Sequence, residues 1–443
     1  MGKFTFIDLF AGVGGFHHAL AAPQFGGECV FAADIDDDCR KVYGAYFPDL
    51  PAESLVGDIR ALTQLPNGKD RPLTQLARMI PDHDVLCAGF PCQPFSKSGA
   101  QQGVLDTTRG TLFFDIMRIV LAKKPNYLIL ENVRNLAGPR HTDTWATIVT
   151  SLRDAGYRVA SDPVVFSPHL LPPDMGGTPQ SRDRVFILAR RVNRRKESVI
   201  GEPLATRAPE NGWDPNDWDI HRLLLPDSQI KNVKDYRLSA KEGAWIDAWQ
   251  AFAQGIPDDN LPGFPIWVDE FRRTPRIDPD TPEWKADFLR KNSEFYRQHR
   301  GFLDKWQTRQ WVKSDPNSTV RDFPASRRKF EWQARSAQPT RADRDLWQLT
   351  LHFRPSGIRV KPATYLPALV AITQTSIIGS RRRRITPLEA GRLQAWPDDL
   401  FSKGGVDDPT AYKQAGNGVH SGVVQYMARR LFEDGGHDWG SED

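Results

Sequence analysis

A cysteine in a loop between two prolines is the first residue whose surroundings suit a chemical reaction. Cys92 lies in the segment GFPCQPFS, residues 89–96, directly after an apolar run that predicts a strand. An isolated cysteine is usually buried and inert. A rigid polar loop, however, suits a nucleophilic thiolate better than core packing. Cys92 is therefore a candidate nucleophile.

An acidic and a basic segment supply partners for such a nucleophile. Glu131 closes the apolar run 127–130, and a carboxyl group beside apolar strand ends can have a raised pKa and act as an acid near neutral pH. Gln180, Arg182 and Arg184 alternate in the segment QSRDR, so an extended chain would point them to one side. That set suits a phosphate or a base edge. Considered without the other segments, a solvent-exposed edge strand explains it equally well.

A glycine-rich turn near the start of the chain indicates a ligand site. The segment DLFAGVGG, residues 8–15, follows a predicted strand, and its small residues let a ligand approach the backbone. The GxGxxG fingerprint fails, because His17 takes its last position. Asp34 ends the second predicted strand, where an acid typically binds ribose hydroxyls, and Asp58 could accept a hydrogen bond from an adenine amino group. Each acid alone is more often a solvated loop carboxylate, but together they favour an adenosine-containing ligand.

Short apolar runs predict the strands that must position these segments. Amphipathic stretches alternate with them, and residues 111–123 and 421–432 have the apolar spacing of helices. This order predicts an α/β fold, a Rossmann-like and mostly parallel sheet with helices on both faces. The predicted strands are residues 4–10, 29–34, 84–90, 127–131 and 185–189.

Composition and charge exclude several classes of protein. The chain has 443 residues, 40% hydrophobic and 26% charged, which excludes a disordered or collagen-like chain. It shows neither a membrane-spanning stretch nor a signal-peptide pattern, so we expect a cytoplasmic protein. The four cysteines form no CxxC pair, so neither a metal site nor a disulfide framework is expected. The net charge of +4 permits a nucleic-acid partner without requiring one.

A change in composition marks a second domain. The run 190–196 is polar and basic, and ten of the 13 tryptophans lie between Trp213 and Trp347, among 23 Lys/Arg and 22 Asp/Glu. We expect a first domain at residues 1–193 and an irregular, tryptophan-rich domain at 194–380. The segment 381–443 is then expected to return to the first domain.

The segments together resemble the motifs of DNA (cytosine-5) methyltransferases, in the same order. DLFAGVGG resembles the cofactor loop of that family, PCQPFS its nucleophile loop, ENV its acid motif and QSRDR its basic motif. RITPLE with RLQ, within residues 384–394, resembles the late element RxLTxxExxRLQ, and YKQAGNGV at 412–419 resembles YKQxGNxV. The resemblance covers residues 1–190 and 350–432. It leaves the tryptophan-rich middle, where the family has its variable target-recognition domain.

The resemblance implies methyl transfer from S-adenosylmethionine to C5 of a cytosine that is flipped out of duplex DNA. C5 is a poor nucleophile until a thiolate adds to C6 and converts the ring into an enamine, the role implied for Cys92. Glu131 would hydrogen-bond or protonate N3. Arg184 would hold the base from its O2 side, and Arg182 would support the same pocket.

The resemblance also implies a cofactor pocket at the strand ends. Phe10 would stack on adenine, Asp34 would bind the ribose and Asp58 the adenine amine. Ile35 stands where an aromatic residue often packs on adenine, and Ala19 and Gly418 also depart from the family pattern, which affects cofactor packing rather than the reaction. The pocket would be completed by Gly12, Gly14, Gly15, Pro91, Leu112 and Asn417.

Double-stranded DNA is the implied partner. A solvated charged face is the alternative for each arginine of the middle domain. We expect a monomer that meets no membrane, lies at the nucleoid through its DNA, and protects host DNA from a cognate restriction endonuclease acting on the same site. The expected DNA contacts are Gln93, Ser96, Gln180, Arg321, Arg327, Arg328 and Arg384.

Other functions are compatible with parts of this pattern. An RNA (tRNA) cytosine-5 methyltransferase of related fold would carry similar motifs, although the long middle domain favours DNA. A catalytically silent DNA-binding subunit would keep the scaffold, but the intact Cys92, Glu131 and arginines argue against it. The incomplete glycine fingerprint disfavours a nicotinamide-dependent oxidoreductase.

Overall fold

The computed structural model describes residues 4–91, 111–192, 199–200, 203–257, 261–313, 315–369 and 375–434. Cys92, Gln93 and Ser96 lie outside these ranges. Within the ranges, no helix combines the length and the apolar character needed to cross a membrane.

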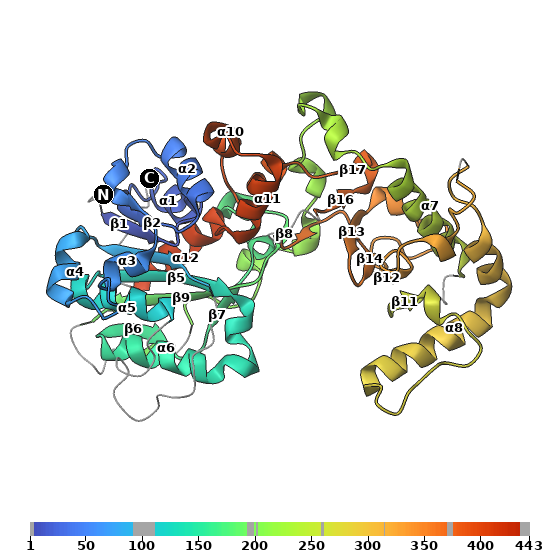
Figure 1. Cartoon of the computed structure of the whole chain (residues 1–443), viewed down its shortest axis with the longest axis horizontal. Helices are drawn as coiled ribbons and strands as arrows, with labels where there is room; N and C mark the ends of the chain where they lie inside the picture. Colours follow the sequence, from blue (N-terminus) through green and yellow to red (C-terminus); the bar gives the residue numbers. More distant parts are fainter. Residues whose placement is uncertain are drawn as a thin grey trace. The chain divides into compact units, whose positions relative to one another are not determined.

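The chain forms two compact units (Figure 1). The first comprises residues 1–218, 367–372 and 387–443, and the second comprises 219–366 and 373–386. In the described part of the first unit, strands form one sheet in the order β10-β6-β9-β5-β4-β1-β2-β3, with β7 paired to β9. The strands are β1 (Thr5–Leu9), β2 (Glu28–Ala33), β3 (Leu55–Val56), β4 (Val85–Gly89), β5 (Tyr127–Val133), β6 (Tyr157–Ala160), β7 (Val164–Phe166), β9 (Arg184–Arg191) and β10 (Val199–Ile200).

This sheet is mostly parallel, as predicted. β1, β2, β3, β4 and β5 run parallel to one another, whereas β9 is antiparallel to β5, β6 and β7. The alternation of side chains along each strand buries both faces, because Val85 and Cys87 face one core cluster while Leu86 and Ala88 face the other. The near-continuous apolar runs in the sequence follow from this burial on two sides.

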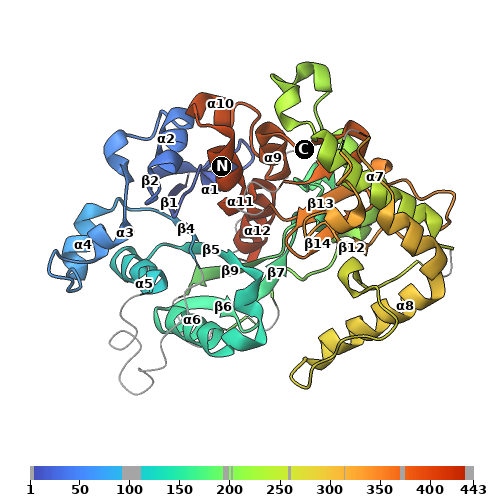
Figure 2. The same ribbon diagram turned by 45° about the vertical axis from the view of Figure 1, so that its right-hand side comes forward.

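Helices cover both faces of the sheet (Figure 2). Phe16 of α1 and Leu431 of α12 lie in one core cluster, and Ile116 of α5 and Ile148 of α6 lie in the other. The α/β fold, the five strands and the two helices predicted from the sequence are confirmed. The helices of this unit are α1 (Gly15–Leu20), α2 (Asp37–Tyr46), α3 (Ile59–Thr63), α4 (Leu73–Met79), α5 (Leu112–Lys123), α6 (Thr142–Asp154), α9 (Pro387–Leu393), α10 (Leu400–Gly404), α11 (Asp408–Asn417) and α12 (Ser421–Asp434).

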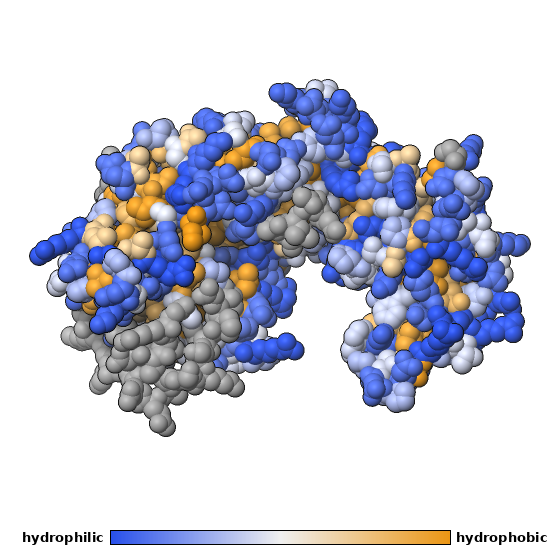
Figure 3. Space-filling model, viewed as in Figure 1, coloured by the Kyte–Doolittle hydropathy of each residue, from blue (hydrophilic) through white to orange (hydrophobic). Residues whose placement is uncertain are grey.

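The second unit is more regular than its sequence indicated. It holds a sheet in the order β11-β12-β14-β13-β16-β17 and two long helices, together with many single turns of 3-10 helix. Its residues in the face shown in Figure 3 are mostly hydrophilic. The elements are β11 (Ile266–Trp267), β12 (Lys329–Trp332), β13 (Thr350–Arg354), β14 (Gly357–Lys361), β16 (Ile377–Ile378), β17 (Arg383–Arg384), α7 (Ala240–Gly255) and α8 (Glu283–Thr308).

Tryptophans build the core of the second unit. Trp249 of α7 is fully buried and stacks on Phe330 of β12, with ring centroids 4.5 Å apart. The Trp306 indole of α8 is buried beside it and donates a hydrogen bond to the Ala248 carbonyl at 2.7 Å. Large aromatic rings with polar edges thus fill a core that short strands alone would leave thin. Aromatic and β-branched residues spread over single turns give weak periodicity, which is why the sequence pattern looked irregular.

The boundary between the units lies at 218/219, whereas the sequence placed it at 193/194. Residues 203–218 pack on the first unit because Trp213 and Trp218 both donate their indole N–H to the His169 carbonyl, at 3.1 and 3.0 Å. Arg207 forms an ion pair with Asp183 at 2.9 Å. The later boundary lies at 386/387 rather than 380/381.

Candidate active site

The carboxyl ends of four parallel strands bring the predicted segments to one edge of the sheet. Phe10 follows β1, Asp34 follows β2, Pro91 follows β4, and Glu131 lies near the end of β5, paired with Gly89. The strand order places β4 between β1 and β5. Open α/β sheets bind ligands at this edge.

The glycine-rich turn is shaped by residues with a left-handed backbone. Phe10, Gly12 and Gly14 have φ values of 56°, 55° and 91°. A Cβ on Gly14 would lie 2.3 Å from the Phe47 ring, and one on Gly15 would lie 2.5 Å from the Val419 carbonyl oxygen. A Cβ on Gly12 would meet no described atom within 4 Å, so the turn leaves open space above Gly12.

Asp34 holds this turn in place. One of its carboxylate oxygens accepts a hydrogen bond from the Gly12 N–H at 2.7 Å, and the other accepts one from the Asp36 N–H at 2.8 Å. Burial raises the pKa of Asp34, and the two backbone donors oppose that rise. Since a carboxylate has about four acceptor positions, Asp34 retains capacity for a further donor.

Ile35 and Asp58 extend the edge beyond Asp34. The Ile35 side chain is 67% exposed, an unusual state for an isoleucine. Asp58 caps α3 by accepting from the Arg60 N–H at 2.9 Å, and it forms an ion pair with the Arg60 side chain at 3.0 Å. Burial works to raise the pKa of Asp58, but the hydrogen bonds and charge of Arg60 outweigh it and lower that pKa.

Glu131 and Arg184 form an ion pair at the end of the sheet. The Arg184 Nε lies 2.9 Å from Glu131 Oε1, because antiparallel pairing of β9 with β5 places Arg184 opposite Val133. Only 8% of Glu131 is exposed. Burial raises the pKa of the Glu131 carboxyl, and the positive charges of Arg184 and Arg182 offset part of that rise. A group of this kind can hold a proton near neutral pH.

Asn132 connects the acid to the start of the nucleophile loop, a contact that the sequence analysis missed. Its buried side-chain amide donates to the Phe90 carbonyl at 2.8 Å. Phe90 stands two residues before Cys92, so this bond fixes the point at which the loop leaves β4. An amide directly after a strand-end carboxylate was the available signal.

Arg182 is buried and binds backbone carbonyls. It is 2% exposed, and its Nη atoms donate to the carbonyls of Leu369, Gly416 and Gly418, at 3.1, 2.9 and 2.8 Å. Burial lowers the pKa of Arg182 to about 9. Gly416 and Gly418 flank Asn417, so Arg182 fixes the backbone on both sides of that residue.

The segment QSRDR is an interrupted strand rather than an exposed edge. Gln180 lies in the short strand β8 (Gln180–Ser181), and β9 begins at Arg184. Gln180 is fully buried, and its amide donates to the Leu393 carbonyl at 3.4 Å. The expected alternation persists in the burial of Gln180 and Arg182. The interpretation as a solvent-exposed edge strand is wrong, because Gln180 and Arg182 are buried and β9 lies between β5 and β6.

The remaining cofactor candidates also lie at element ends. Leu112 is the first residue of α5 and is partly exposed, and Asn417 is the last residue of α11 and is exposed. Pro91 is exposed at the last described position before the nucleophile loop. The Lys413 ammonium of α11 forms an ion pair with Asp36, at the start of α2, at 2.7 Å, which brings α11 close to the end of β2.

The arginines expected to contact DNA have different surroundings in the second unit. Arg328 forms an ion pair with Asp269 at 2.8 Å, and Arg384 forms one with Glu242 at 2.6 Å. The Arg327 guanidinium lies 4.5 Å from the centroid of the Phe353 ring. Arg321 is exposed.

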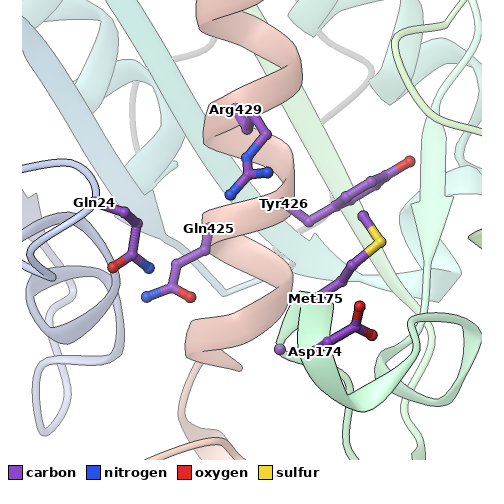
Figure 4. Close-up of a pocket in the computed structure, with 7 residues that line it drawn as sticks. Gln24, Asp174, Met175, Gln425, Tyr426 and Arg429 are labelled. Atoms are coloured by element: carbon purple, nitrogen blue, oxygen red, sulfur yellow. The ribbon is translucent and has the colours of Figure 1, made fainter. Parts of the chain in front are cut away.

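A small pocket lies beside α12, and none of its lining residues is a predicted site residue (Figure 4). Gln425, Tyr426 and Arg429 contribute to it from α12, and Asp174 and Met175 contribute from the 3-10 turn Pro173–Met175. Its polar side chains include exposed Asp174 and Arg429, so it is an open depression of the surface.

Comparison with known proteins identifies the family. The family model for C-5 cytosine-specific DNA methylase matches residues 4–433. The type II methyltransferase M.AluI of Cellulosimicrobium cellulans is 41% identical over 96% of this chain and 91% of its own, and M.BanI of Aneurinibacillus aneurinilyticus is 28% identical over 98% and 96%. The solved Dnmt2 methyltransferase of S. pombe covers 98% of this chain and 100% of its own with a TM-score of 0.49 and 15% identity. By the family model and the match to M.AluI, the chain belongs to the C-5 cytosine-specific DNA methylases and is a DNA (cytosine-5) methyltransferase.

Proposed function

We propose that this enzyme transfers a methyl group from S-adenosylmethionine to C5 of a flipped-out cytosine, through a covalent bond between Cys92 and C6, within a short specific DNA sequence. The observation that carries the proposal is the ion pair of the buried Glu131 with the partly exposed Arg184 at the strand edge, 2.9 Å apart. It stands beside the chain segment that leads to Cys92, to which Asn132 ties it through Phe90.

The pair supplies the acid that cytosine activation needs. Addition of the Cys92 thiolate to C6 moves an electron pair through the ring toward N3, and a proton from Glu131 stabilises the charge there. The raised pKa of Glu131 keeps a larger fraction of the carboxyl protonated near neutral pH. After methyl transfer, a base or water takes the C5 proton, the Cys92 thiolate leaves C6, and N3 returns its proton to Glu131, which restores the ring.

The two arginines have separate parts in this proposal. Arg184 is partly exposed beside Glu131, so its guanidinium can turn to the O2 side of the base. Arg182 contacts backbone carbonyls and is a positioning residue. It keeps the backbone around Asn417 aligned with the base pocket.

The strand edge fits S-adenosylmethionine. The open space above Gly12 admits a ligand against the backbone, Asp34 retains acceptor capacity for ribose hydroxyls, and the exposed Ile35 offers an apolar surface to adenine. S-adenosylmethionine supplies the methyl group when bound. Residues proposed to hold it are Phe10, Gly12, Gly14, Gly15, Asp34, Ile35, Asp58, Pro91, Leu112 and Asn417.

Methylation by this enzyme would protect host DNA from a cognate restriction endonuclease. M.AluI and M.BanI are both type II methyltransferases by name, which supports this role. The enzyme would act as a monomer in the cytoplasm, at the nucleoid, with residues 219–366 and 373–386 as the target-recognition domain.

The first test combines methylation mapping with trapping of the covalent bond. Purified protein is incubated with S-adenosylmethionine and mixed-sequence duplex DNA, and 5-methylcytosine is mapped by bisulfite sequencing. We expect modification confined to one short motif. A duplex carrying 5-fluorocytosine in that motif should then stay attached to wild-type protein, because fluorine replaces the C5 hydrogen whose loss as a proton would release Cys92. The same duplex should not become attached to Cys92→Ala.

Other outcomes separate the alternatives. Modification of transfer RNA but not of DNA would favour an RNA methyltransferase, and DNA binding without modification would favour a silent subunit. Undiminished methylation by Cys92→Ala would contradict the covalent mechanism. For the protective role, a plasmid carrying the methylated motif should resist an endonuclease that cuts this motif.

A further inference from the structure

One face of the sheet in the second unit carries a concentration of positive charge. Apolar residues of β12, β13 and β14 face the core, where α7 and α8 pack (Figure 2). The side chains that alternate with them are polar and partly exposed. We name this surface the basic sheet face; it comprises Lys329 and Glu331 of β12, Arg354 of β13, and Arg359 and Lys361 of β14.

Strand pairing fixes the arrangement of these charges. Arg359 lies in the middle strand, opposite Glu331 on one side and His352 on the other, and Lys361 follows it by two residues. Arg354 pairs with Gly357, so it is the diagonal neighbour of Arg359, about 7–8 Å away in a regular sheet. The cations therefore form a continuous group.

Cations outnumber carboxylates on this face. Four cations and one carboxylate give it a net charge of +3. Arg359 is paired with Glu331 at 2.9 Å. Burial and the nearby charge of Arg359 lower the pKa of both Arg354 and Lys361. The positive charges of Arg354, Arg359 and Lys361 therefore repel one another, and Glu331 offsets part of that repulsion.

We propose that the basic sheet face binds the sugar-phosphate backbone of the duplex that the enzyme methylates. A polyanion relieves the repulsion among Arg354, Arg359 and Lys361, and it gains charge-assisted hydrogen bonds from groups that a sheet already holds in place. This assignment rests on the proposed function. The residues of the basic sheet face are not those that the sequence analysis expected to contact DNA. Of those, Arg328 and Arg384 form ion pairs with carboxylates.

The test compares two double variants that each remove one Arg and one Lys. The sheet-face variant is Arg354→Gln with Lys361→Gln. The control is Arg290→Gln with Lys291→Gln on α8 of the same unit, where both cations form exposed ion pairs. Binding of a fluorescent duplex carrying the mapped motif is measured by anisotropy from about 50 to 200 mM salt.

We expect the slope of log affinity against log salt to become shallower by about 0.9 for each lost phosphate contact, or roughly 1.8 for the sheet-face variant. The affinity gap from wild type then narrows about 12-fold across this fourfold salt range. The control should stay within about 0.5 of the wild-type slope. Because neutralisation relieves repulsion, the unfolding temperature of the sheet-face variant should not fall.

Equal slopes for the sheet-face variant, the control and wild type would overturn the assignment, as would weaker binding by the sheet-face variant with an unchanged slope. If the double variant folds poorly, Lys361→Gln alone tests the same assignment, with an expected change of about 0.9 in the slope of log affinity against log salt. Absence of DNA binding by wild-type protein would instead count against the proposed function, so the two failures are distinguishable.

Discussion

Arg182→Lys tests the idea that a buried guanidinium aligns the two halves of the active site. The guanidinium reaches Leu369 through Nη1 and Gly416 and Gly418 through Nη2. A single ammonium cannot occupy both Nη positions, so at least one buried carbonyl loses its donor, at about 1–3 kcal/mol. Because the ammonium also has poorer hydrogen-bond geometry toward the remaining carbonyls, we expect the free energy of unfolding to fall by about 2–4 kcal/mol in total.

The loss should also reach cofactor binding, because Gly416 and Gly418 flank Asn417. If binding must supply about 1–2 kcal/mol to order that backbone, the Kd for S-adenosylmethionine rises about 5- to 30-fold. Urea unfolding and calorimetry measure the two effects. Arg184→Lys is the matched control: its single carboxylate partner and partial exposure predict a stability loss under about 1.5 kcal/mol. Unfolding of Arg182→Lys within about 0.5 kcal/mol of wild type, with unchanged Kd, would refute the reasoning.

Three further predictions address the acid and the packing. Glu131→Gln should lower single-turnover methylation about 10²- to 10⁴-fold, and a loss below tenfold would contradict its role as the acid. Because the active form holds the Glu131 proton, methylation should fall as pH rises through the raised pKa of Glu131. Arg184→Met removes the charge that lowers this pKa most, so the decline in methylation should move to higher pH. A move to lower pH would contradict the role of Glu131 as the acid. Gly422→Ala places a Cβ 1.9 Å from the Gly176 carbonyl oxygen and should cost about 1–3 kcal/mol in thermal unfolding, whereas Gly243→Ala, which meets open space, should be neutral or stabilising.

Much of the catalytic unit follows from local sequence. The buried strands read as continuous apolar runs because both faces of the sheet are covered, and residues such as Asp34 and Glu131 come directly after them. Since parallel strands end at one edge, their juxtaposition needs no knowledge of the loops between them.

Contacts between distant segments could not be predicted in this way. The ion pair of Arg184 with Glu131 depends on the antiparallel register of β9 against β5, which no local pattern sets. The bonds of Arg182 to Gly416 and Gly418 join residues 234 and 236 positions apart. Residues 203–218 likewise have the composition of the second unit, but two indole hydrogen bonds to His169 hold them on the first.

The position of α12 has a consequence for protein synthesis. The strands of the sheet are complete in sequence by Ile200 and the second unit by residue 386, yet Val424 and Leu431 of α12 lie in the same core cluster as Phe6 and Ile129. Since a chain leaves the ribosome from its amino end, the part of this sheet face that α12 covers stays exposed until residues 421–434 emerge, although α1 already packs beside it. The second unit can fold before those residues are made. A chain that ends before residue 421 is therefore expected to expose apolar core residues of the first unit, whatever the state of the second.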